Sequence, residues 1–417
     1  MTTGTATDGL SISYPRLRAR LDALAEIGAI DDGGCARLAL TDEDRLGRDL
    51  VVSWMRDLGL RVDVDEIGNV VGTWPADSTD APVMTGSHID TVATGGRFDG
   101  TLGVLAGIEV LETIITAGVE LARPLAVAFF TDEEGSRFAP DMLGSLVFAG
   151  GMPLEDALAI RGFDGAMLGE ELLRIGYAGP QPCPSRPPHA YVELHIEQGP
   201  VLEAEALTIG AVTGVQGISW TELSIAGQSN HAGTTPMSMR HDAGYAAAAI
   251  AAFVRGLATE MGPPQVATVG RINVHPNLVN VVAARATLTV DLRNTDDALV
   301  TESERRLAVF CAELAQREGV TIEARSLARF APVDFDAAVV ALVEEVARAR
   351  GLSTKRMPSG AGHDAQMLAR MCPAGMVFVP SVRGISHNPA ELTSDADLEA
   401  GANVLLHVLL RLASAER

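Results

Sequence analysis

The sequence predicts an α/β protein in which a larger domain, built on a mixed and largely parallel sheet flanked by helices, is interrupted by a smaller α/β sandwich. The chain of 417 residues exceeds the usual length of one domain, so two domains are expected. Strand-like and helix-like segments alternate over residues 1–212 and again over 330–417, as they do around a parallel sheet. Residues 213–329 contain two strand–helix–strand sets, which are typical of a small open-faced sandwich.

The first part of the larger domain shows its elements in regular order. Leu17, Leu21, Leu24 and Ile27 recur at helical spacing and predict an opening helix. The next elements are a helix over 42–59, a hairpin over 61–74 that turns at 68–69, a strand over 81–88, a helix over 101–118 and a buried strand over 123–131. A proline-rich loop over 180–190 then leads into a strand over 191–199.

The inserted segment repeats strands and helices of similar length. Its expected strands cover 217–227, 265–274, 284–294 and 320–328, and its expected helices cover 240–258 and 297–319. After it, an apolar run over 375–381 predicts another buried strand of the larger domain.

Charge and composition narrow the classes of function. A formal net charge of −22 and a pI near 4.8 argue against nucleic acid and anionic membrane surfaces as partners. The four cysteines are far apart, so neither a disulfide framework nor a zinc ribbon is expected. We see no secretory signal pattern and no apolar run of the roughly 20 residues that span a bilayer, so a cytoplasmic protein is expected.

Four stretches of the larger domain place possible metal ligands directly after apolar strands or in loops beside them. They hold His88, Asp90 and Asp99 in GSHIDTVATGGRFDG, the acids of TDEEG at 131–135, His195 in ELHIEQG and His387 in GISHNPAE. Ligands of open α/β sheets bind at the carboxyl ends of the strands. Histidine and carboxylate together suit zinc, manganese or cobalt. A single such residue is more often a turn or capping residue, but four of them at strand ends favour a metal site.

The motifs also resemble those of the M20 metallopeptidase and amidase superfamily, and of its hydantoinase/carbamoylase branch in particular. Seven motifs occur in the order of the family: GSHIDTVATGGRFDGTLGVLAG, FTDEEGSRF, HIEQGPVLE, GQSNHAGTTPM, NVVAARATLTVDLRN, SGAGHDA and GISHNPAE. The resemblance extends from about residue 15 to the carboxyl terminus. It implies a catalytic domain formed by residues 1–212 and 330–417, and a lid and dimerisation domain formed by residues 213–329.

The resemblance implies two divalent metal ions in each subunit, zinc, manganese, cobalt or nickel, bridged by Asp99 and a water. His88 and His195 would complete one site, and Glu134 and His387 the other. A histidine at position 195 marks the amidase branch, because peptidase and aminoacylase relatives generally have an acid there.

The resemblance also implies the catalytic and substrate-binding residues. Glu133 would act as general base and then general acid, and Asp90 would hold the His88 ring by its other nitrogen. In the lid domain, His231 would donate to the oxyanion, and Arg293 with Asn280 would bind the substrate carboxylate. Gln198, Gly362 and His363 would line the substrate pocket of the catalytic domain. A homodimer is implied, in which some lid residues reach the site of the partner subunit.

The expected activity is metal-dependent hydrolysis of the carbamoyl C–N bond of an N-carbamoyl-L-amino acid, which yields the amino acid, ammonia and carbon dioxide. Allantoate, ureidoglycolate and 3-ureidopropionate are alternative substrates, because each combines a ureido head with a carboxylate. A dipeptidase or an N-acyl-amino-acid deacylase is a more distant alternative, against which His195, Gln198 and Arg293 argue. A non-catalytic binding protein is disfavoured, because every expected ligand and the base are present.

Overall fold

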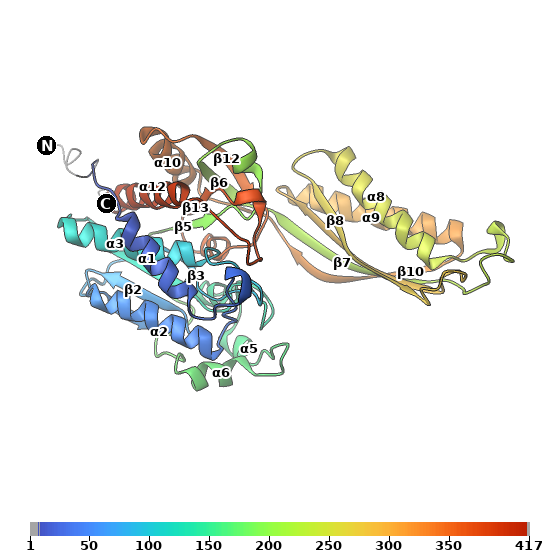
Figure 1. The fold of residues 1–417 in the computed structure, drawn as a ribbon, viewed down its shortest axis with the longest axis horizontal. Helices are drawn as coiled ribbons and strands as arrows, with labels where there is room; N and C mark the ends of the chain where they lie inside the picture. Colours follow the sequence, from blue (N-terminus) through green and yellow to red (C-terminus); the bar gives the residue numbers. More distant parts are fainter. Residues whose placement is uncertain (1–6, 8, 415–417) are drawn as a thin grey trace. The chain divides into compact units, whose positions relative to one another are not determined.

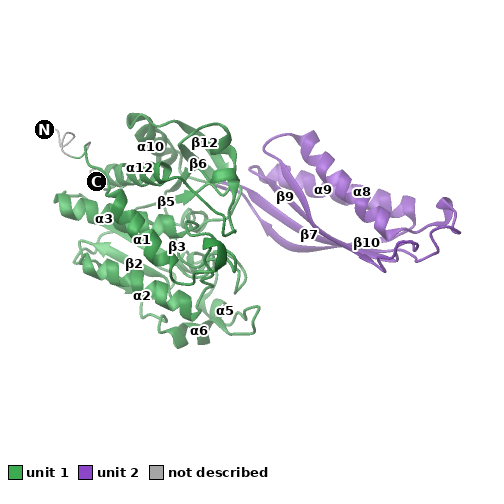
Figure 2. Cartoon of the chain, viewed as in Figure 1, with its two compact units in different colours: residues 1–214, 334–417 green, residues 215–333 purple. Residues whose placement is uncertain are grey.

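The structure is a computed structural model that describes residue 7 and residues 9–414. The chain forms two compact units, residues 1–214 with 334–417 and residues 215–333 (Figure 2). We call them unit 1 and unit 2. Each unit has its own sheet and its own helices.

Unit 1 is built on a mixed sheet whose central strands are parallel (Figure 1). In spatial order the strands are β1 (Arg61–Val64), β2 (Val70–Trp74), β4 (Leu125–Phe130), β3 (Val83–His88), β5 (Ala190–Ile196), β13 (Ala374–Val379), β6 (Ile209–Val215) and β11 (Val333–Asp334), with β12 (Thr354–Ser359) beside β6. The pairs β4–β3, β3–β5 and β5–β13 are parallel, whereas β1–β2, β2–β4 and β13–β6 are antiparallel. Every residue of β3, β4, β5 and β13 is buried, as expected of strands covered on both faces.

Helices of unit 1 cover this sheet. The longer ones are α1 (Tyr14–Ala25), α2 (Asp42–Asp57), α3 (Thr101–Ala117), α10 (Ala337–Ala349) and α12 (Asp395–Ser414). The shorter ones are α4 (Leu143–Phe148), α5 (Leu154–Leu158), α6 (Leu168–Ile175), α7 (Val201–Ala204) and α11 (Asp364–Leu368). The start of α2 follows capping chemistry, because the side chain of Thr41 accepts a hydrogen bond from the Asp44 amide and acids occupy the first turn.

Unit 2 is a four-stranded antiparallel sheet with two helices packed against it. The strand order is β10 (Thr321–Phe330), β7 (Gly217–Ala226), β9 (Arg285–Asn294) and β8 (Val266–His275), and the helices are α8 (Ala243–Met261) and α9 (Asp297–Glu318). Both helices lie over the same face of the sheet (Figure 1). Buried and more exposed residues alternate along β9, so one face of this strand joins the core and the other does not.

The predicted fold class is confirmed by this architecture, with differences at the margins. The opening helix ends at Ala25, so Ile27 lies beyond it. The strands β6, β11 and β12 had no clear alternation in the sequence and were not predicted individually. Within the described residues, no helix is long and apolar enough to cross a membrane.

Candidate metal centre

The candidate site lies at the carboxyl ends of three neighbouring parallel strands of unit 1. His88 is the last residue of β3, His195 lies one residue before the end of β5, and the acidic run 131–135 begins directly after β4. Because these strands are parallel and adjacent, their carboxyl ends meet at one edge of the sheet. The backbone at the start of α3 packs over the His88 ring only because residue 100 is glycine. A Cβ there would lie 2.3 Å from Nε2 of His88, and the φ of +64° disfavours any other residue.

His88, Asp99 and His195 form the first group of possible metal ligands. Their ligand atoms lie within 4.8 Å of one another, and all three residues are buried. Oδ1 of Asp99 is 3.7 Å from Nε2 of His88 and 3.2 Å from Nε2 of His195. Nδ1 of each ring donates to a backbone carbonyl, at 2.9 Å to Asp90 and at 2.8 Å to Ile196. Both Nε2 atoms are thereby directed toward Asp99, as required of ligands to one cation.

Asp99, Glu134 and His387 form the second group, which shares Asp99 with the first. Nε2 of His387 is 3.4 Å from Oδ2 of Asp99 and 3.3 Å from Oε2 of Glu134. The two carboxylate oxygens of Asp99 therefore face different groups. The side chain of His387 is 50% exposed, whereas the other members are largely buried. Two groups of nitrogen and carboxylate oxygen donors fit first-row divalent cations.

Burial and charge perturb the titration of these ligands. Burial lowers the pKa of His88 to about 4. Burial also opposes the charged form of His195, but the hydrogen bond and charge of Asp99 outweigh it and raise the pKa of His195 to about 9. Burial alone would raise the pKa of Asp99, yet the hydrogen bond and charge of His195 bring it below its ordinary value. Asp99 and His195 therefore favour each other's charged forms.

Glu133 lies beside the first group without belonging to it. The residue is 7% exposed, and its Oε2 is 3.3 Å from Nε2 of His88. Burial, followed by the charges of Asp364 and Glu134, raises the pKa of Glu133 well above its ordinary value. The position and protonation equilibrium of this carboxyl group suit a group that exchanges protons.

Asp90 contacts the Nδ1 atom of His88 through its backbone. The backbone carbonyl of Asp90, and not its carboxylate, accepts the hydrogen bond from Nδ1 of His88, since the nearest carboxylate oxygen is 3.9 Å away. The carboxylate instead accepts the amide protons of Glu133 and Glu134, both at 3.3 Å. Asp90 therefore holds the backbone of the acidic run, while its peptide group orients His88.

Gln198 and His363 lie against the metal groups, and Gly362 lies beside them. Nε2 of Gln198 donates to Oδ2 of Asp99 at 2.8 Å and lies 3.3 Å from the hydroxyl of Ser386. Oε1 of Gln198 is buried and has no hydrogen-bond partner among the described residues. The ring of His363 is 4.5 Å from that of His195, and a Cβ on Gly362 would meet Cε of Met142 at 2.7 Å.

Two further buried acids at this centre escaped the sequence reasoning. Glu193 precedes His195 by two residues on β5, so strand alternation places both on one face, and it groups with His195 and His363. Glu391 ends the motif that contains His387 and accepts hydrogen bonds from the amides of Phe98 and Asp99. Alternation could have indicated Glu193, whereas nothing local in the sequence indicates the contact of Glu391.

The structure separates the three lid residues that were grouped from the sequence. His231 forms an isolated β-bridge with Val281, and the carbonyl of Asn280 accepts a hydrogen bond from the Ala232 amide at 2.9 Å. His231 and Asn280 therefore lie at one end of the sheet of unit 2. Arg293 lies at the other end of the ten-residue strand β9, which spans roughly 30 Å at about 3.3 Å per residue. The guanidinium of Arg293 is paired with Asp291 at 2.8 Å.

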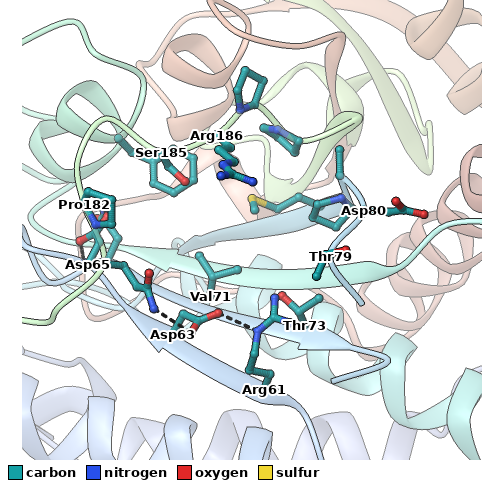
Figure 3. A pocket seen from close by; sticks show the side chains of 18 of the residues that line it. Arg61, Asp63, Asp65, Val71, Thr73, Thr79, Asp80, Pro182, Ser185 and Arg186 are labelled. Carbon is teal, nitrogen blue, oxygen red and sulfur yellow. Dashed lines mark hydrogen bonds and ion pairs between the residues drawn. The ribbon is translucent and has the colours of Figure 1, made fainter. Parts of the chain in front are cut away.

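A cavity of about 760 Å³ lies elsewhere in unit 1 (Figure 3). The β1–β2 hairpin, residues 78–82 and the proline-rich segment 181–188 line it, and Arg61 and Asp63 form an ion pair on its wall. Met84 in its lining is near the amino end of β3, at the opposite end of the strand from His88. Cavity size therefore does not mark the place where the metal-type ligands meet.

Comparison with known proteins shows the family of the chain. Residues 84–411 match the model of peptidase family M20/M25/M40. The chain is 42% identical to an N-carbamoyl-L-amino-acid amidohydrolase of Rhizobium meliloti, over 96% of this chain and 97% of the relative. It is 36% identical to the allantoate amidohydrolase of Escherichia coli, over 94% and 96% of the two chains. A hydantoinase/carbamoylase family amidase of Burkholderia multivorans has a similar structure, with a TM-score of 0.95, 47% identity, and 98% and 100% of the two chains covered. The chain is thus a hydrolase that belongs to peptidase family M20/M25/M40 and, within it, to the hydantoinase/carbamoylase amidases.

Proposed function

We propose that this enzyme hydrolyses the carbamoyl C–N bond of N-carbamoyl-L-amino acids and releases the amino acid, ammonia and carbon dioxide. The observation that carries the proposal is the buried and unpartnered Oε1 of Gln198 beside the two metal groups. Since Nε2 of Gln198 donates to the Asp99 carboxylate, the side-chain oxygen of Gln198 can accept a hydrogen bond from a bound substrate. A carbamoyl group offers N–H donors at that position, whereas an acetyl group offers a methyl group.

The two metal groups support a pair of divalent cations, with Asp99 common to both. Cations held there would polarise the substrate carbonyl and lower the pKa of water. Glu133 takes a proton from the attacking water and returns it to the departing nitrogen, for which its place beside His88 is suitable. The Asp90 carboxylate accepts the amides of Glu133 and Glu134 and so fixes the positions of the base and of one ligand.

We propose that the lid residues act in two different active sites of a homodimer. One small substrate cannot contact both ends of β9, so Arg293 and the pair His231 and Asn280 serve separate substrate molecules. Nδ1 of His231 accepts the amides of Gly233 and Thr234, at 3.1 and 3.3 Å, which leaves the proton on Nε2 to stabilise an oxyanion.

Mixing two inactive variants tests this arrangement. His231→Ala and Glu133→Gln subunits, exchanged to equilibrium, should recover roughly a quarter of wild-type activity, because half of the dimers are mixed and one of their two sites is intact. If His231 served its own subunit, both sites of a mixed dimer would carry a defect, and activity would stay at the level of the separate variants.

The substrate is tested with a panel on metal-reconstituted enzyme, with ammonia release and amine release as readouts. N-carbamoyl-L-amino acids should exceed their N-acetyl counterparts in kcat/KM by at least about 100-fold, because a buried acceptor left unpaired is costly. Gln198→Met should reduce that ratio by about 10-fold or more, and the N-acetyl substrate is the internal control. An equal loss on both substrates would remove Gln198 from carbamoyl recognition.

Allantoate, ureidoglycolate and 3-ureidopropionate belong in the same panel. Each carries the ureido head that Gln198 favours and a carboxylate for Arg293, and one relative is named an allantoate amidohydrolase. A higher kcat/KM for one of them than for every N-carbamoyl-L-amino acid would replace the proposed substrate and leave the site chemistry unchanged.

A further inference from the structure

Glu391 connects two distant segments of the candidate metal centre. It is 5% exposed and follows His387 by four residues. Its Oε1 accepts the amide of Phe98 at 2.9 Å and that of Asp99 at 3.2 Å, and Asp99 is 292 positions away in the sequence. Residue 96 must be glycine for this contact, because a Cβ there would lie 2.2 Å from Cδ of Glu391.

The same segment also holds the Asp99 carboxylate through Ser386. The hydroxyl of Ser386 donates to Oδ2 of Asp99 at 2.8 Å and lies 3.4 Å from Oε2 of Glu391. Asp99 is therefore held at its backbone amide by Glu391 and at its carboxylate by Ser386. Oδ2 is the oxygen that faces His387 in the second metal group.

The two metal groups differ in what supports their histidines. His88 and His195 lie on buried strands, and backbone carbonyls orient both rings. His387 lies in a loop, has a positive φ of 55° and is half exposed. Its position relative to Asp99 therefore depends on the tether that Glu391 and Ser386 form between the two loops.

We propose that Glu391 is a positioning residue that fixes Asp99 relative to His387 and thereby sets the affinity of the second group for its cation. Glu391 is not itself a ligand, since Oε1 is occupied by two amide donors and the residue belongs to neither group. The inference rests on the proposed metal binding and not on the identity of the substrate. Residues that orient metal ligands typically contribute 10–100-fold to metal affinity.

The test measures Mn²⁺ binding to the full chain after it has been stripped with a chelator, by competition with a fluorescent chelator and by counting bound ions. In Glu391→Ala the weaker of two binding steps should lose about 10–100-fold in affinity, while the tighter step changes less than about 3-fold. Glu391→Gln keeps an acceptor oxygen for the amides and should lose less than Glu391→Ala. Ser386→Ala removes only a hydroxyl group and should also weaken the weaker binding step. This variant replaces Glu391→Ala in the test if Glu391→Ala does not fold.

Glu109→Gln is the matched control. Glu109 is a buried carboxylate on α3 that accepts the Ser13 amide at 2.8 Å and has no contact with Asp99. This variant should lower the melting temperature and leave both affinities unchanged. Equal weakening of both steps in Glu391→Ala, no weakening, or a wild-type chain that binds fewer than two cations would overturn the proposal. The metal-binding assay contains no substrate. A failure of the proposed carbamoyl activity would therefore be detected only in the kinetic assays and would not affect this test.

Discussion

Replacing Glu133 by glutamine removes one carboxylate and leaves the shape of the site. Glu133 is buried, lies 3.3 Å from Nε2 of His88 and belongs to neither metal group. A positioned general base typically contributes 10²–10⁴-fold to the rate, so Glu133→Gln should lower kcat by about that factor. At about 1.4 kcal/mol for each tenfold change, this corresponds to roughly 3–5.5 kcal/mol of transition-state stabilisation.

The pH dependence gives the same experiment a second readout. A base must be ionised, so wild-type kcat/KM should fall as pH decreases through the pKa of Glu133. Burial with the charges of Asp364 and Glu134 raises this pKa, and bound cations would lower it. Residual activity of Glu133→Gln should lack this acidic decline.

The assay is ammonia release together with the metal content of the same sample. Glu133→Gln should keep both cations, whereas Glu134→Gln, one residue away, should lose affinity for one of them because Glu134 belongs to the second group. Loss of metal in Glu133→Gln would make Glu133 a ligand. Activity within about 3-fold of wild type would refute its role as the base.

Three further outcomes follow from the structure. Gly100→Ala should abolish tight metal binding measured by chelator competition, because its Cβ would lie 2.3 Å from Nε2 of His88. Arg293→Ala should raise KM for carboxylate substrates by about 10-fold or more with a smaller change in kcat, and Arg271→Ala, an exposed arginine paired with Glu222, is the steady-state kinetic control. Chelation should lower the melting temperature in calorimetry, since each cation at 100 times its Kd stabilises the folded chain by about 2.7 kcal/mol; an unchanged temperature would show that cations do not bind the folded state preferentially.

The strand ends of unit 1 were predictable because they follow from local pattern. Apolar runs predicted the buried strands that end near His88, Thr131 and His195, and parallel pairing of adjacent strands brings those ends together. The strands β6, β11 and β12 were not individually predictable, because their pairing depends on neighbours that are distant in sequence.

Other features of the site depend on tertiary geometry that no local pattern encodes. The sequence cannot distinguish the carbonyl of Asp90 from its carboxylate, and the structure assigns the contact with His88 to the carbonyl. The family motifs contain His231 and Arg293, but the length of β9 separates them. The bond between Glu391 and the Asp99 amide joins residues that are 292 positions apart.

The excess of buried acids at this centre favours the binding of cations. Burial raises the pKa of seven carboxyl groups at this centre above the ordinary values, and they belong to Asp90, Asp132, Glu133, Glu134, Glu193, Asp364 and Glu391. Carboxylates so placed repel one another, and protons must neutralise several of them when no cation is bound. Cations supply the positive charge in place of those protons, so binding releases protons and its affinity increases with pH. In the proposed mechanism the same charge would keep Glu133 ionised, which would couple occupancy of the metal groups to the presence of an active base.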